Sequence, residues 1–288
     1  PPLTVTQRLD LKALFQKLDV ATPSGQEPAA AAAFLEKLLV LADGAGGDPP
    51  KPEKPDISSI KDLQGLSGNA QLAAIHERKD GLGESIALWI KARGEINKRF
   101  PSWQRFKDLH ALAVGLPEAA EIGQSLAAID ASRGLLLEPD PVPPLIQQLL
   151  EALRSTLNDI QTTLAETYQR EMIALEANAL WQRLEKAQKS SLIERFQLQP
   201  PASIKLANEA DILAALKESS LNGRRTLVEA MPQRFQKALE EAARLLEPKA
   251  TRVALPAATI HDEGELEIWI DEVRDTIRDY LKEGPVIL

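Results

Sequence analysis

The amino-acid sequence predicts a mainly α-helical fold: a multi-helix assembly with a long central coiled-coil-like helix and a small α+β subdomain at the C-terminus. Two observations favour helix. Leu, Ala, Glu and Gln are abundant, whereas aromatic residues make up only 4 % of the chain, and unbranched side chains lose little rotamer freedom in a helix. Apolar residues also recur at steps of three and four in most segments, which is the period of an amphipathic helix.

The first two predicted helices form a hairpin within residues 1–43. Apolar residues share one face of residues 4–18, and a proline, a serine and a glycine then break the pattern. Pro28 opens the second helix, since proline is tolerated in a first helical turn. Residues 44–57 follow as a Pro- and Gly-rich linker, which is either a semi-rigid spacer or a loop lying over the body.

Residues 58–137 are expected to form a helical domain of several short helices separated by glycine and proline. Residues 138–198 follow as one long helix, because no proline or glycine occurs between Leu145 and Gln197. At ~1.5 Å per residue this helix would be roughly 75 Å long. Helices of that length are uncommon, so we expect a kink or break near residues 188–191.

The predicted long helix carries an apolar seam with heptad-like spacing. Steps of four and three separate its apolar residues, as in a coiled coil. The seam is therefore expected to face a partner helix, which belongs either to the same chain or to another chain. The seam residues are Leu150, Leu153, Leu157, Ile160 and Leu164.

Residues 199–288 are expected to fold as the small α+β subdomain. Short β-compatible runs occur at 203–206 and 251–255, with two helical patterns between them. An amphipathic helix with Trp269 on its buried face comes next, and the chain ends in a β-compatible Val-Ile-Leu. This order predicts a strand–helix–strand unit over residues 251–288, with parallel strands and a right-handed crossover.

Composition and motifs exclude several functional classes. The absence of cysteine removes disulfides, thiolate nucleophiles and cysteine-zinc sites, and it fits an intracellular protein. A net charge of −8 argues against a protein that coats nucleic acid. No apolar run approaches the roughly 18 residues of a transmembrane helix. Walker A, G-x-G-x-x-G and G-x-S-x-G motifs are absent, and the three histidines lie far apart, so no cofactor or metal site is predicted.

Two charged segments stand out. Carboxylates are concentrated in residues 262–283, where a solvated helix face is a better interpretation than a hydrolase active site built on paired carboxylates. Residues 89–107 are basic and interleaved with aromatic residues, a mixture that suits contact with a nucleic-acid backbone and stacking on its bases. Aromatic residues at helical spacing also commonly face a core. The candidate nucleic-acid contacts are Lys98, Arg99, Arg105 and Lys107.

Six short motifs occur in an order that resembles the C-terminal region of a known family. They are GAGGDPPKPEKP at 44–55, RGLLLEPDP at 133–141, LWQRL at 180–184, LEPK at 246–249 followed by VALP, Trp269 in the last helix, and the chain-ending GPVIL at 284–288. Together they resemble the large P-loop ATPases, called BrxC or PglY, of BREX phage-exclusion systems. The start at Pro1 rather than at Met fits a piece of a longer chain.

The resemblance implies a bacterial cytoplasmic protein that acts in defence against phage, and a parent ATPase that binds ATP upstream of these residues. None of the ATPase motifs occurs in this sequence, so no catalytic, cofactor-binding or metal-binding residue is carried over. The resemblance predicts a non-enzymatic region for interaction and assembly, which docks other BREX subunits or the body of the parent ATPase without a membrane. Oligomer formation is left open, and the alternative is a DNA-contacting module that uses residues 89–107.

Overall fold

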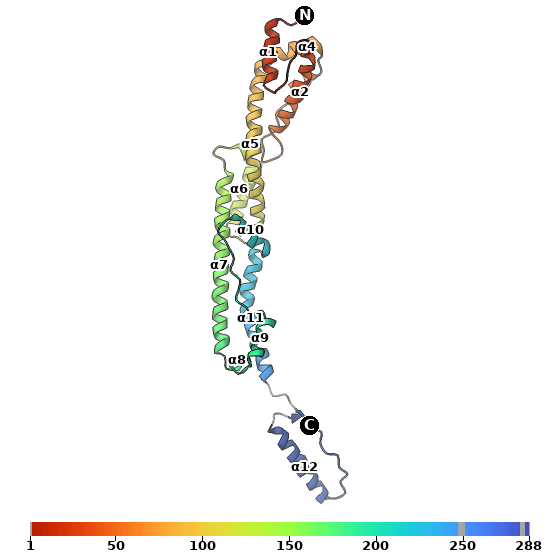
Figure 1. The fold of residues 1–288 in the computed structure, drawn as a ribbon, viewed down its shortest axis with the longest axis vertical. Coiled ribbons are helices and arrows are strands. Elements are labelled where there is room, and N and C mark those ends of the chain that lie inside the picture. Colours follow the sequence, from red (N-terminus) through yellow and green to blue (C-terminus); the bar gives the residue numbers. More distant parts are fainter. Residues whose placement is uncertain (1, 247–250, 283–285, 288) are drawn as a thin grey trace. The chain divides into compact units, whose positions relative to one another are not determined.

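The computed structural model describes residues 2–246, 251–282 and 286–287, and the fold is mainly α-helical, as predicted (Figure 1). The chain divides into two compact units. The first comprises Pro1–Asp159 and Ile204–Arg224, and the second comprises Ile160–Ser203 and Arg225–Leu288. Helices α7 (Val142–Ala177) and α11 (Leu221–Leu246) contribute residues to both units.

The first unit begins with α1 (Val5–Gln16) and α2 (Glu27–Gly44), the two helices expected at this end of the chain. Thr4 starts α1 with a capping box: its side chain accepts a hydrogen bond from the Gln7 backbone N–H, and the Gln7 side chain accepts one from the Thr4 backbone. The rings of Phe15 and Phe34 are both fully buried, and their centroids lie 4.7 Å apart. This aromatic contact fixes α1 against α2.

The first unit contains further helices. They are α3 (Ser58–Gln64), α4 (Gly68–Glu77), α5 (Lys79–Leu112), α6 (Ala119–Ala131), the 3₁₀ turn η1 (Gly134–Leu136) and the short α10 (Glu209–Glu218). Of these, α3, α4 and the N-terminal part of α5 extend the core of α1 and α2. Several short helices were expected here, but α5 is one continuous helix. It runs through three glycines and Pro101 without a break. An internal proline costs ~3 kcal/mol. The buried face of α5 offsets this cost, since it includes Trp89, Trp103 and Phe106.

The Pro- and Gly-rich segment after α2 is a loop held against the body rather than a spacer. One guanidinium nitrogen of Arg133 donates to the carbonyl oxygens of Gly47, at 2.7 Å, and Lys51, at 3.0 Å. The backbone N–H of Leu135 donates to the carbonyl oxygen of Pro50 at 3.1 Å. Of the two interpretations of residues 44–57, the structure therefore has the loop lying over the body.

Gly46 allows this loop to fold back on itself. A Cβ at this position would collide with the carbonyl oxygen of Glu53 and lie 2.8 Å from the Cα of Lys54, and both atoms belong to the backbone. We expect Gly46→Ala to lower the free energy of unfolding by about 1–3 kcal/mol, measured by urea denaturation. The control is Gly94→Ala in α5, where a Cβ meets nothing within 4 Å. That variant should be slightly stabilising, and equal stability of the two variants would contradict the prediction.

Helix α7 ends much earlier than the predicted long helix over residues 138–198. The chain leaves the helix at Asn178, whose side chain accepts from the backbone N–H of Leu180 and caps α8 (Ala179–Arg183). Glu185 then starts α9 (Lys186–Arg195) with a capping box. The break expected near residues 188–191 therefore lies at Asn178 and Glu185 instead. Capping oxygens at these two residues satisfy the backbone donors that each new helix exposes.

The core of the second unit lies between the C-terminal part of α7, helices α8 and α9, and residues 225–246 of α11. Tyr168 packs edge-on against Phe235, with ring centroids 5.9 Å apart. Trp181 is buried in the same cluster, at 4 % exposure. The break in the helix at Asn178 therefore gives Trp181 a place in the core.

The predicted α+β subdomain over residues 199–288 is not supported. Strand β1 (Thr251–Arg252) precedes α12 (Glu263–Leu281) in the chain, and strand β2 (Val286–Ile287) follows it. The two strands pair in parallel with each other, but each has only two residues. Residues 203–206 are not a strand, and residues 204–224 belong to the first unit. A pair of two-residue strands has too small a face to bury a helix, and α12 has no buried residue.

Candidate docking surface

Helix α12 is well specified by its own sequence. The Asp262 side chain accepts from the backbone N–H of Glu265 at 2.9 Å and caps the first turn. Glu263 and Glu265 place negative charge at the N-terminus, and Arg278 places positive charge in the last turn. Both charges interact favourably with the helix dipole. The helix therefore has local reasons to form that do not depend on packing.

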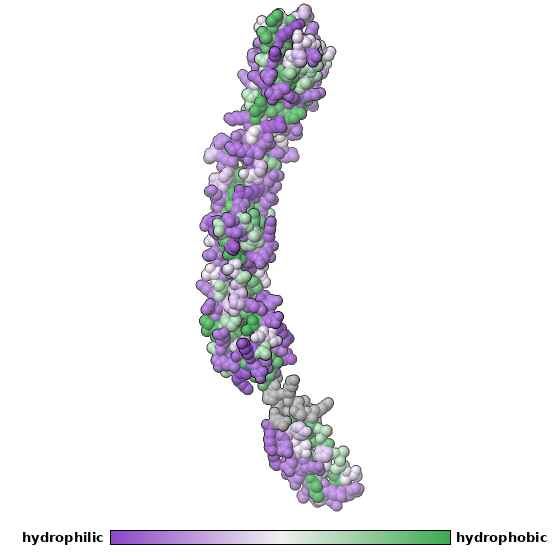
Figure 2. All heavy atoms as spheres, viewed as in Figure 1, coloured by the Kyte–Doolittle hydropathy of each residue, from purple (hydrophilic) through white to green (hydrophobic). Residues whose placement is uncertain are grey.

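One face of α12 is apolar and only partly covered, since Trp269, Val273 and Ile277 are partly buried and the rest of the face is exposed. Leu266, Ile270, Tyr280 and Leu281 are between 38 % and 55 % exposed, and α12 buries no side chain. In the part of Figure 2 that holds α12 and the segment before it, hydrophilic residues gather on the left and hydrophobic residues toward the right. An amphipathic helix commonly lays such a face in a core, so this exposed face identifies a candidate surface for docking.

A shallow groove of about 400 Å³ runs along this face. Trp269, Val273 and Ile277 contribute to its apolar lining, and Arg274 and Arg278 also line it. The indole Nε1 of Trp269 donates to the carbonyl oxygen of Pro256 at 2.7 Å. The Trp269 side chain therefore holds the segment before α12 against the helix. The sequence predicted instead that Trp269 faces a core.

Ion pairs occupy the two arginines of α12 and Lys282, the residue that follows the helix. Arg274 pairs with Asp271, Arg278 with Asp275 and Lys282 with Asp279, each to the residue three positions earlier in the chain. The hydrogen bond from Lys282 lowers the pKa of Asp279, and the same contact raises the pKa of Lys282. At the other end, hydrogen bonds from the His261 backbone and side chain lower the pKa of Glu265.

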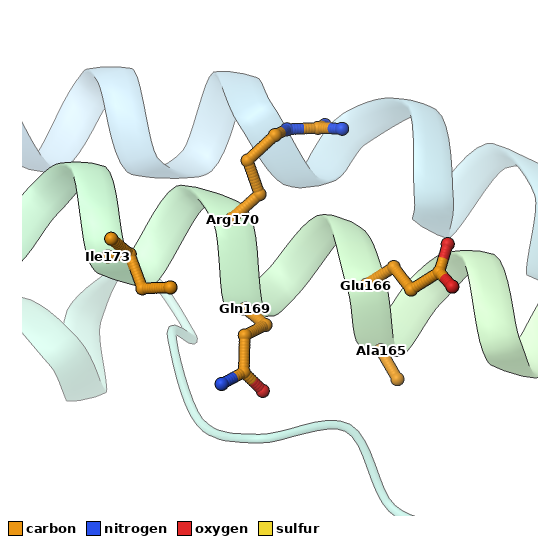
Figure 3. Close-up of a pocket in the computed structure, with 5 residues that line it drawn as sticks. All are labelled: Ala165, Glu166, Gln169, Arg170 and Ile173. Atoms are coloured by element: carbon orange, nitrogen blue, oxygen red, sulfur yellow. The ribbon is translucent and has the colours of Figure 1, made fainter.

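A second groove, of about 580 Å³, lies along α7 (Figure 3). Gln169 and Arg170 point to opposite sides of the helix in this view, and Ile173 is 60 % exposed. Arg170 pairs with the neighbouring Glu171 at 3.3 Å. The groove is shallow and mostly apolar, and its lining shows no pair of groups placed for acid–base chemistry.

The structure buries most of the predicted seam of α7 inside a single chain. Leu153 and Leu157 are fully buried, and Ile160 and Leu164 are at most 8 % exposed. Leu150 is only partly buried, and its neighbour Leu149 is fully buried instead. These side chains are therefore covered by the chain itself and form no exposed surface for a second chain.

The four candidate nucleic-acid contacts do not share one environment. Lys98 and Lys107 are exposed on α5. Arg99 is buried, at 8 % exposure, and Arg105 forms a two-point ion pair with Glu209 at the start of α10. The four side chains therefore do not form a single exposed basic patch.

Arg99 is held by acceptors on every side. Its guanidinium donates to the carbonyl oxygen of Leu137 at 2.8 Å, to Glu95 at 3.1 Å and to Glu138. Burial disfavours the Arg99 cation, but the hydrogen bond to Glu138 and the charges of Glu138 and Asp140 outweigh it and raise the pKa. Arg99 therefore joins α5 to the segment around residue 137 and is unavailable to a phosphate.

Three titratable groups meet at a place that the sequence analysis did not single out. Asp10 of α1 accepts from the Lys79 ammonium, and the Nε2 atom of His76 lies 3.0 Å from the same carboxylate oxygen. These hydrogen bonds, that of Lys79 first, lower the pKa of Asp10. The three residues come from different helices, so no local spacing marks them. They form a partly exposed ion-pair cluster that joins α1, α4 and α5.

No family model, curated protein or solved structure matches this chain. In the described part of the chain, no helix combines the length and apolar character needed to cross a membrane. Among the same residues, no group of three or more His, Asp and Glu side chains is arranged to hold a metal ion.

Proposed function

We propose that this chain is a docking and assembly region, and that the apolar face of α12 is its contact surface. The observation that carries the proposal is an amphipathic helix whose capping and charges favour its formation, but whose apolar face is nowhere fully buried by the residues that the structure describes. Burying such a face against a partner is favourable by about 25 cal/mol per Å² of apolar area. The other predicted seam, on α7, is satisfied inside the chain.

The family resemblance supplies the context of this proposal. The chain would belong to the C-terminal region of a BREX-type ATPase in bacterial phage defence, where α12 docks another defence subunit or the body of the parent ATPase. ATP binding would reside in the parent protein, and this chain would have no turnover of its own. Sustained ATP hydrolysis by the purified chain would contradict the non-catalytic part of the proposal.

The test compares the same substitution on opposite faces of α12. Ile270→Asp places a carboxylate in the apolar face, whereas Ile268→Asp places it about 200° around the helix, at a side chain that is 70 % exposed. Each variant is co-expressed with the other subunits of a BREX system, and the affinity of the recovered complex is measured by calorimetry. We expect Ile270→Asp to weaken docking at least about tenfold and Ile268→Asp to leave it unchanged.

Circular dichroism of both variants should show the same helix content. Equal affinities for Ile270→Asp, Ile268→Asp and the unaltered chain would contradict the proposal. A complex that forms without α12 contacts would do the same, since the surface would then be unnecessary.

A further inference from the structure

We propose that the occupant of the α12 surface is a cationic amphipathic helix, with an apolar stripe flanked by Lys and Arg. This inference rests on the proposed docking function and adds the chemistry of the partner. The shape of the surface is the first argument. The residues that line the groove run from Trp269 to Leu281 along α12, a length of ~18 Å, and an apolar stripe of one partner helix matches a groove of this kind.

The charge of α12 is the second argument. Residues 262–282 contain eight carboxylates and three cations, a net charge of −5. All three cations are already paired within these residues, to Asp271, Asp275 and Asp279, at 2.6–2.8 Å. Among the described residues, Glu263, Glu267 and Glu272 have no cationic partner. The excess negative charge is therefore available to a partner.

The position of these carboxylates is the third argument. Glu265 lies four residues before Trp269 and Glu272 lies three residues after it, so both border the Trp269 edge of the apolar face. Glu267 lies three residues before Ile270 and borders the opposite edge. A helix that fills the groove therefore meets carboxylates along the Trp269 edge, and it meets Glu267 beside the N-terminal half of the opposite edge. Arg274 and Arg278 line the C-terminal half of that opposite edge, where each pairs with an aspartate three residues earlier.

The same charges disfavour two other occupants. A second copy of α12 would place one helix with a net charge of −5 against another of the same charge. Like charges across an interface cost several kcal/mol of binding free energy. A membrane surface rich in anionic lipid would also repel this helix, because helices that lie on such surfaces carry cationic polar faces. A cationic helix is the occupant that satisfies both the apolar face and the carboxylates.

The experiment uses the full chain and two synthetic amphipathic helices of about 20 residues, long enough to form a helix. The two peptides share one Leu/Ala stripe and differ only in Lys or Glu at the flanking positions. Fluorescence anisotropy measures the Kd of each labelled peptide. We expect the Lys peptide to bind at least about tenfold more tightly than the Glu peptide at low salt. The difference should shrink as salt shortens the screening length.

Charge reversal in the chain supplies the second measurement. Glu267→Lys with Glu272→Lys should weaken binding of the Lys peptide and strengthen binding of the Glu peptide. The matched control is Glu36→Lys with Glu84→Lys, two exposed carboxylates in the first unit, and it should change neither affinity. Both pairs keep the apolar face intact, and circular dichroism verifies that α12 is retained.

Four outcomes would overturn the inference. The two peptides could bind with equal affinity, or neither peptide could bind. The mass of the chain could double with concentration in light scattering, or the chain could sediment with anionic vesicles. Its failure is separable from failure of the docking function. If Ile270→Asp disrupts the assembled complex but the peptides are not distinguished, the docking surface remains and only its charge selectivity is wrong. If Ile270→Asp has no effect, the docking function itself fails.

Discussion

Arg99→Ala is expected to lower the free energy of unfolding by about 3 kcal/mol. Arg99 is the charged side chain that bridges α5 and the segment around residue 137, and it is 8 % exposed. Its removal leaves the carbonyl oxygens of Leu135 and Leu137 without this donor and leaves Glu95 without its ion-pair partner. The loss therefore combines unpaired acceptors with a cavity, and chemical denaturation of the full chain measures it.

Lys98→Ala is the matched control, because Lys98 is the neighbouring cation in the same helix and is exposed. It should change the free energy of unfolding by less than about 0.5 kcal/mol, as at other exposed positions. The prediction that Arg99 contacts DNA gives another pattern: both alanine variants would lower DNA retention at low salt, and neither would unfold more easily. That pattern would contradict the structural role of Arg99.

Trp103→Ala is expected to cost about 3–5 kcal/mol, the range for removal of a large aromatic from a core. The Trp103 side chain is 2 % exposed and packs edge-on against Phe106, with ring centroids 6.1 Å apart. Alanine would leave a cavity under α5 and remove this aromatic contact. Thermal unfolding followed by circular dichroism should show a large fall in Tm.

Gln104→Ala is the control for Trp103, because Gln104 is the next residue and is exposed. It should leave Tm nearly unchanged. A stable Trp103→Ala variant that loses affinity for single-stranded DNA would contradict the core assignment and support base stacking by this aromatic. Loss of stability without an effect of Gln104→Ala would confirm that the aromatic residues of segment 89–107 serve the core.

The sequence predicted helices best where the signal is local. The spacing of apolar residues and the position of Pro28 predicted α1 and α2, because both features act within a few turns of the chain. The same logic failed at Pro101. A proline in an isolated helix favours a break, but the buried residues on both sides of Pro101 keep α5 continuous.

For the candidate docking surface, too, the sequence predicted the local features and missed what depends on packing. Sequence spacing identified the apolar face of α12 and the carboxylates around it, since both are properties of one helix. It also predicted that this face is buried, which is wrong, because α12 buries no side chain. The error for the basic segment 89–107 was the opposite one. Its composition suggested an exposed surface that binds nucleic acid, but its aromatic residues and Arg99 are largely buried.

The sequence by itself determined that this protein is mainly helical and where the first two helices lie, because these properties depend on residues three or four positions apart. The tertiary structure alone decided that the Pro- and Gly-rich loop lies against Arg133, that Arg99 is enclosed by carboxylates, and that the described residues bury no side chain of α12. Each of these depends on contacts between residues far apart in the chain. A local pattern shows that a face is apolar, but only the packed chain shows what covers it.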